Sequence, residues 1–147
     1  KGLKMTTYKK ILAAVDLTEE STQVLDRARS MADLHEAELS IVHIIEPLGY
    51  AYGGDIPMDL TEVQKQLEDH AKKYLKDTGE KYNTPEGRQH VIIGRPETEI
   101  HRLAEDGGYD LVLVGSHGRH GIQLLLGSTA NGVLHGAKCD VLAVRID

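Results

Sequence analysis

Several residue types are scarce in this chain of 147 residues, and each scarcity excludes a class of protein. Phe and Trp are absent, so an aromatic surface on which nucleic-acid bases stack is not expected. The single cysteine, Cys139, excludes an internal disulfide and suits a reducing cytosol. Because Cys139 lies in an apolar segment, we expect it to be a packed core thiol.

Basic residues and long apolar runs are scarce as well. The formal net charge is −6 and no block of basic residues occurs, so neither nucleic acid nor an anionic membrane is an expected partner. No apolar run approaches about 18 residues and no signal peptide is recognised, which favours a cytoplasmic location. Residues 1–4 precede Met5 and are expected to be a remnant of cloning. One domain is therefore predicted over residues 5–147.

The first half of the chain predicts two buried strands and two amphipathic helices. Residues 11–15 and 39–45 are continuous apolar runs, typical of strands covered on both faces. Between them, apolar side chains recur at helical spacing from Thr18 to His35, with Thr18 as the expected N-cap and Glu19 and Glu20 in the first turn. A long loop over 46–59, of the kind that often forms a lid or binding segment, precedes a second helix over 60–75 and a polar connection over 79–87.

The second half continues the alternation of strand and helix. Strands are predicted at 90–93, 111–114 and 141–144, with helices at 97–106 and about 128–136. This alternation is typical of an α/β protein with an open five-stranded parallel sheet and right-handed crossovers. Ligands of such sheets bind outside the carboxyl ends of the strands, where the strand order reverses.

Two strand ends are suited to such a ligand. The fourth strand is followed by glycines 115, 118 and 121 and then by Gly127-Ser128 at the start of a helix, a layout in which backbone N–H groups can surround an anion. The same glycines could serve only as turn residues. Asp16 follows the first strand, where its carboxylate could accept hydrogen bonds from a ribose or simply cap nearby backbone N–H groups.

The chain resembles the universal stress protein family from Tyr8 to Arg145. The matching segments are YKKILAAVDLTEES, LSIVHIIEP, GRPETEI, DLVLVGSHGRHG, LLLGSTAN and CDVLAVR. The resemblance implies a Rossmann-like fold, similar to that of the adenine nucleotide alpha-hydrolases, with strand order 3-2-1-4-5 and helices on both faces. It also implies a homodimer. By that strand order Val141–Val144 lies at a sheet edge, and pairing with a second copy would cover this apolar edge.

The nucleotide-binding branch of the family carries the motif G-x2-G-x9-G-[ST] after the fourth strand. This chain has Gly115, Gly118, then eight residues and Gly127-Ser128, one residue fewer than the motif. The resemblance implies that Asp16 and Gly115 meet a ribose, that the backbone of Ile44 meets adenine, and that the phosphates are held by Gly118, Gly127, Ser128 and Thr129. Arg119 could pair with a phosphate or remain a solvated surface residue. The expected ligand is ATP or another adenine nucleotide, with or without magnesium.

Metal and catalytic sites are not expected. His101, His117, His120 and His135 fit no closed zinc set, and cysteine ligands are lacking. His43, inside the second strand, is expected to be a hydrogen-bonded core residue. No nucleophile with a suitable base is recognised, so a dedicated enzyme is not predicted, although slow ATP hydrolysis stays open.

Two functions remain open on the sequence. The first is a stress-response protein that binds ATP and acts as a homodimeric regulatory module. The second is a dimer of the same family that binds no nucleotide and acts only through protein contacts. The glycines favour the first function, and the missing residue in their spacing favours the second.

Overall fold

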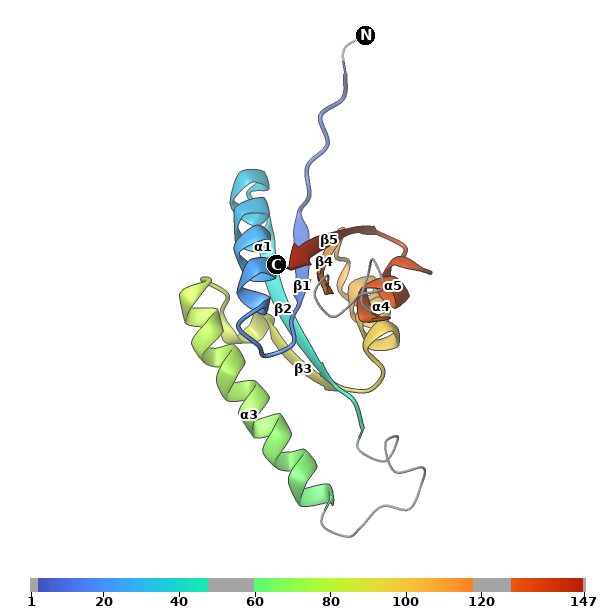
Figure 1. Ribbon diagram of the computed structural model, residues 1–147. Coiled ribbons are helices and arrows are strands. Elements are labelled where there is room, and N and C mark those ends of the chain that lie inside the picture. Colours follow the sequence, from blue (N-terminus) through green and yellow to red (C-terminus); the bar gives the residue numbers. More distant parts are fainter. Residues whose placement is uncertain (1–2, 48–59, 118–127, 147) are drawn as a thin grey trace.

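A parallel five-stranded sheet forms the centre of the chain (Figure 1). The computed structural model describes residues 3–47, 60–117 and 128–146, with the backbone alone for residues 117 and 128. The strands are β1 (Lys10–Ala14), β2 (Glu38–Ile45), β3 (Gln89–Ile93), β4 (Leu111–His117) and β5 (Asp140–Ile146). Their order is β3-β2-β1-β4-β5, which confirms the predicted fold class and strand order.

Helices cover both faces of the sheet (Figure 1). They are α1 (Ser21–His35), α3 (Leu60–Lys81), α4 (Pro96–Gly107) and α5 (Ser128–Leu134), with a 3₁₀ turn, η1, at Glu86–Arg88. Alternate residues of a strand point to opposite faces, so Ile11 and Ala13 pack against α1, whereas Leu12 packs toward α4 and α5. Both faces of the central strands are therefore buried, as the continuous apolar runs predicted.

The start of α1 differs from the prediction. The helix begins at Ser21 rather than at Thr18, and Glu20 holds the N-cap position without a side-chain capping bond. Thr18 is not an N-cap, because its N–H and its hydroxyl both donate to Asp16 Oδ1, at 3.0 and 2.6 Å. Leu17 has a φ of 60° in the same turn. The prediction that Glu19 and Glu20 lie in the first helical turn was therefore wrong.

The other differences concern length. The helix α3 continues to Lys81, through part of the predicted polar connection, and Gly79 lies buried inside it. Strand β4 continues through Gly115 to residue 117 because it pairs with β5 over seven residue pairs, from Leu111–Asp140 to His117–Ile146. Gly115 is thus a strand residue and not the first residue of a loop.

The long loop predicted over 46–59 falls mostly outside the described residues. Only Glu46 and Pro47 of this segment are described. Across the described ranges, no helix combines the length and the apolar character needed to cross a membrane.

Candidate functional site

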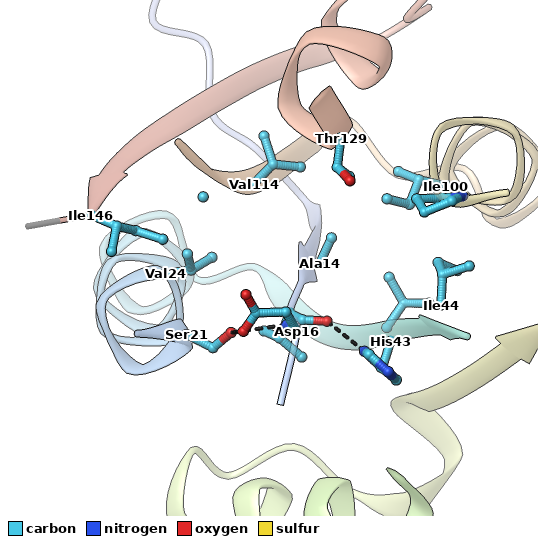
Figure 2. A pocket seen from close by; sticks show the side chains of 14 residues that line it. Ala14, Asp16, Ser21, Val24, His43, Ile44, Ile100, Val114, Thr129 and Ile146 are labelled. Atoms are coloured by element: carbon cyan, nitrogen blue, oxygen red, sulfur yellow. Dashed lines mark hydrogen bonds between the residues drawn. The ribbon is translucent and has the colours of Figure 1, made fainter. Parts of the chain in front are cut away.

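A pocket opens at the carboxyl ends of β1 and β4, where the strand order reverses, as expected for a sheet of this type (Figure 2). Its volume is about 120 Å³. Figure 2 shows one wall formed by Ser21, Val24 and Ile146 and the opposite wall formed by His43, Ile44 and Ile100. Most of the wall is aliphatic, so a polar ligand must be recognised by a few polar groups.

Asp16 supplies the carboxylate at this pocket. Its Oδ1 atom accepts hydrogen bonds from the Thr18 N–H at 3.0 Å, the Thr18 hydroxyl at 2.6 Å and the Ser21 hydroxyl at 2.8 Å. The Ser21 hydroxyl oxygen in turn accepts from the Asp16 N–H at 2.9 Å. These bonds fix the orientation of the carboxylate at the start of α1, so Asp16 does cap local groups in addition to lining the pocket.

The side chain of Tyr74 lies near this end of α1, and its pKa is raised. Tyr74 donates a hydrogen bond from its hydroxyl to the Thr18 carbonyl oxygen at 3.4 Å. Burial, and then the charges of Asp16 and Glu19, raise the pKa of Tyr74, although a hydrogen bond with Thr78 opposes them. Tyr74 therefore remains a neutral hydrogen-bond donor at neutral pH.

His43 is hydrogen-bonded, as predicted, and it also lines the pocket. Its Nδ1 lies 2.8 Å from the Val15 carbonyl oxygen (Figure 2). Because a carbonyl oxygen only accepts, Nδ1 must carry the proton in this bond. The bond ties the carboxyl end of β2 to the residue that precedes Asp16, so it positions both strands at the pocket.

Gly115 lies in a closely packed part of strand β4 rather than in a turn. A Cβ atom at this position would collide with Ile146 Cδ1 and would lie 3.3 Å from Val24 Cγ2. Both of these side chains also line the pocket. The absence of a side chain at Gly115 therefore lets β4, β5 and α1 approach one another beside the site.

The pocket continues toward α5. Thr129, in the first turn of that helix, and Pro96, at the start of α4, line both the pocket and an adjoining open groove of about 540 Å³. Among the described residues that line the groove, the cationic side chain is Arg95, and the carboxylates are those of Glu46 and Glu97. A ligand larger than the 120 Å³ pocket would extend past Thr129.

Four of the residues predicted for the site line this one pocket: Asp16, Ile44, Gly115 and Thr129. Ser128 begins α5 next to Thr129, and its side chain is not described. Gly118, Arg119 and Gly127 lie outside the described residues. Sequence reasoning did not identify Ser21, Val24, Pro96, Ile100 or Ile146 as pocket residues. Ser21 alone had a local signal, since a hydroxyl five residues after Asp16 can reach back over one turn.

Of the histidines considered as metal ligands, His101 and His135 have described side chains, and both lie near the end of α5. His101 Nε2 lies 2.7 Å from the Val133 carbonyl oxygen, and His135 follows the end of α5. Within the described part of the chain, no group of three or more His, Cys, Asp or Glu side chains could hold a metal ion. The side chain of residue 117 and all of residue 120 fall outside that part.

Comparison with known sequences identifies relatives over almost the whole chain. The model of the family described as the universal stress protein family matches residues 7–145. Universal stress protein A homolog 1 of Coxiella burnetii is 44% identical over 139 residues, covering 93% of this chain and 96% of the relative. Homolog 2 of the same organism is 45% identical over 146 residues, covering 97% and 98%.

Solved structures share the fold. MJ0577, the universal stress protein of Methanocaldococcus jannaschii, superimposes with a TM-score of 0.78 at 26% identity, covering 97% of this chain and 99% of that one. UspA of Lactobacillus plantarum superimposes with a TM-score of 0.82 at 23% identity, and the match covers 96% of this chain and 100% of that one. A universal stress protein in complex with cAMP superimposes with a TM-score of 0.63 at 23% identity, and the match covers 95% of this chain and 98% of that one.

Proposed function

The chain belongs to the universal stress protein family, and from that premise we propose that it is a homodimeric stress-response protein that binds an adenine nucleotide, with ATP as the expected ligand. The pocket between the carboxyl ends of β1 and β4 is the proposed site. Its role is regulatory binding, with no residue assigned to catalysis. One structure of the same fold holds cAMP, which supports an adenine nucleotide as the ligand class.

The observation that carries this proposal is the convergence of Asp16, Ile44, Gly115 and Thr129 on one pocket. These residues are far apart in the sequence and belong to four separate segments. The resemblance assigns Asp16 and Gly115 to the ribose, Ile44 to adenine and Thr129 to the phosphates of one nucleotide.

The size of the pocket suggests which part of the nucleotide it holds. A cavity of about 150 Å³ accommodates benzene, so 120 Å³ corresponds to about one ring. Aliphatic side chains from β2 and α4, among them Val42, Ile44 and Ile100, suit the faces of a base. Because adenine has two fused rings, in this proposal the base occupies the pocket only in part, with its edge bonded to the backbone of Ile44.

The ribose and the phosphates are then directed outward. The Asp16 carboxylate, oriented by Thr18 and Ser21, would accept hydrogen bonds from the ribose hydroxyls, with Gly115 alongside. The phosphates would extend past Thr129 toward Ser128, Gly127 and Gly118, with Arg119 as a candidate counter-charge. Magnesium would accompany the phosphates and not the protein carboxylates.

The proposal is tested by calorimetric titration with ATP and magnesium. Asp16→Asn keeps an oxygen for the Thr18 and Ser21 donors but removes the charge. We expect it to weaken binding about tenfold to a hundredfold, since a hydrogen bond to a charged group contributes about 1.5–3 kcal/mol. Asp69→Asn, an exposed carboxylate on α3, is the matched control and should leave the affinity unchanged. No heat and no thermal shift at millimolar ATP would reject nucleotide binding.

The second candidate function is a family dimer that acts only through protein contacts. One observation favours it: the glycine segment is one residue shorter than the nucleotide-binding motif. One residue spans up to about 3.3–3.6 Å, comparable to the length of a hydrogen bond, so its loss can remove a phosphate-facing N–H from reach. Mass spectrometry of the ligand released on denaturing the purified protein separates the two functions.

A further inference from the structure

A second cavity, of about 280 Å³, lies between α4 and α5 near the amino ends of β4 and β5. Its floor is formed by Val112 and Val141, which are directly paired residues of the two strands. Ala104 on α4 and Val133 on α5 form its walls, and both are buried in the core on this face of the sheet. The pocket considered above lies at the opposite ends of the same strands.

Two glycines with left-handed backbone conformations border the cavity. Gly108 ends α4 with a φ of 71°, and Gly136 follows α5 with a φ of 83°. These left-handed conformations favour glycine. A Cβ atom added at Gly108 would have no neighbour within 4 Å, and one at Gly136 would lie 3.6 Å from His101 Cε1.

The polar side chains around this cavity already bond to protein partners. His101 Nε2 lies 2.7 Å from the Val133 carbonyl oxygen, and the Tyr109 hydroxyl donates to Ser40 Oγ at 2.8 Å. At the rim, Lys138 Nζ lies 3.3 Å from Glu105 Oε1, so the two charges offset each other. The lining offered to a ligand is thus mainly aliphatic, with the ring of Tyr109 and the thiol of Cys139.

The thiol contributes no charge to the cavity. Burial, and then the negative charges of Asp140 and Asp110, raise the pKa of Cys139. The group is therefore a neutral thiol at neutral pH, and it behaves as a small apolar surface. The thiol therefore adds to the apolar part of the cavity lining.

We propose that this cavity is a binding site for a small, neutral, apolar molecule of the size of a one- or two-ring aromatic compound. The volume supports the size, since a cavity of about 150 Å³ holds benzene and this one has about 280 Å³. The offset charges of Lys138 and Glu105 at the rim favour a ligand without a net charge. This site is separate from the proposed nucleotide pocket and does not depend on it.

The probe for this site is indole, and the reporter is Cys139. Because Cys139 is the only cysteine of the chain, its alkylation by iodoacetamide can be followed by mass spectrometry of the whole protein. Indole bound in the cavity shields the thiol. At an indole concentration about ten times Kd, we expect alkylation to slow roughly tenfold, because only the unoccupied fraction reacts. Benzoate, which carries a charge, should shield the thiol much less.

Variants in which a larger side chain fills the cavity test whether indole binds there. Ala104→Leu places a larger side chain inside the cavity from a helix position that leucine favours, so indole should no longer slow alkylation of this variant. Ala137→Leu fills the cavity from the segment after α5 and serves if the first variant folds poorly. Lys65→Ala, which changes an exposed lysine on α3 outside the cavity lining, is the matched control and should retain the effect of indole.

Two results would overturn the proposal. One is unchanged alkylation of the parent protein at saturating indole. The other is equal slowing in the parent and in the filled variants, which would place indole elsewhere. The same assay on Asp16→Asn keeps this site distinct from the nucleotide pocket, because that substitution should change ATP binding and leave the effect of indole intact.

Discussion

Tyr82 shows how one buried side chain links charge to stability. The residue is 6% exposed, and its hydroxyl donates to Asp26 Oδ1 at 2.7 Å. Its carbonyl oxygen accepts from Arg29 Nη1 at 2.8 Å, so the segment after α3 is fastened to α1 at two points. Burial first, and then the bond to Asp26, raise the pKa of Tyr82 from 10.0 to about 12.

This shift predicts a loss of stability in alkali. The folded state keeps the Tyr82 proton above pH 10.0, whereas the unfolded state releases it, so the contribution is complete below pH 10.0 and is lost as the pH rises to about 12. The free energy of unfolding should fall by up to about 1.4 kcal/mol per pH unit across this window from this group. In Tyr82→Phe, which is less stable at neutral pH, urea unfolding should show a shallower decline. Parallel declines in the two proteins would contradict the assignment.

At Asp16, local pattern and tertiary context disagree. The sequence places a threonine and two glutamates before an amphipathic helix, which is a normal N-terminal signature. In the structure the Asp16 carboxylate bonds to Thr18 and Ser21 and delays the helix to Ser21. Helix propensity predicted the helix correctly. Its first residue, however, depends on the Asp16 carboxylate, a hydrogen-bond acceptor that helix propensity does not take into account.

Among the elements, α3 provides a sharp case. Gly79 was predicted to begin a polar connection, yet it lies buried in the helix. A Cβ atom there would lie 2.5 Å from the Thr84 carbonyl oxygen and would overlap the Gln89 side chain, which itself donates to Thr84. Glycine permits this contact between the helix and the segment leading to β3. Such a contact is not visible in a local sequence pattern.

A substitution tests which effect prevails at Gly79. Helix propensity alone predicts that Gly79→Ala stabilises α3 by about 1 kcal/mol. The close contact predicts the opposite, and we expect a destabilisation of about 1–3 kcal/mol, as for other overpacked sites. Gly87→Ala is the control, because a Cβ atom at Gly87 would have no neighbour within 4 Å. Denaturant unfolding of both variants checks this, and a gain in stability for Gly79→Ala would reject the packing account.

Strand β5 carries the prediction of a dimer. It forms one edge of the sheet and pairs with β4 along its other side. An exposed strand edge tends to pair with another strand, and antiparallel pairing with a second copy around a two-fold axis would cover it. Leu142→Pro removes a backbone donor from this strand, so sedimentation should show a shift toward monomer.

The sedimentation experiment has its own control. The control is Ala143→Ser, which alters an exposed side chain of β5 and keeps the backbone N–H of that residue. Ala143→Ser should remain dimeric. A parent protein that is monomeric at micromolar concentration, or a dimer unaffected by Leu142→Pro, would contradict pairing through β5.

At the scale of the whole molecule, the buried apolar side chains form two cores, one on each face of the sheet. One core packs α1 and α3 against the sheet, and the other packs α4 and α5. We therefore expect EDTA to leave the melting temperature unchanged. A clear decrease that zinc reverses would show a structural metal, and differential scanning calorimetry with and without chelator decides between these outcomes.

The α/β class with a parallel sheet was predictable because periodicity repeats in every element, whereas the strand order came from the resemblance to the family. Continuous apolar strands and amphipathic helices alternate, which leaves few topologies. The pocket was predictable only in part. Asp16 and Gly115 mark strand ends or glycine motifs, but Val24, Ile100 and Ile146 are ordinary core residues in the sequence. Their place at the site follows from packing between distant segments.

The pairing of β1 with β4 has a consequence for folding kinetics. Ile11 pairs with Leu111 across 100 residues, whereas it pairs with Leu39 on its other side across only 28. Pairings between residues distant in sequence are slow to form, so the boundary between β1 and β4 is where two early-folding halves would join late. Asp16 and Ile44 belong to one half, and Gly115 and Thr129 belong to the other. A molecule held in that pocket therefore contacts both halves, and it would slow unfolding by opposing their separation.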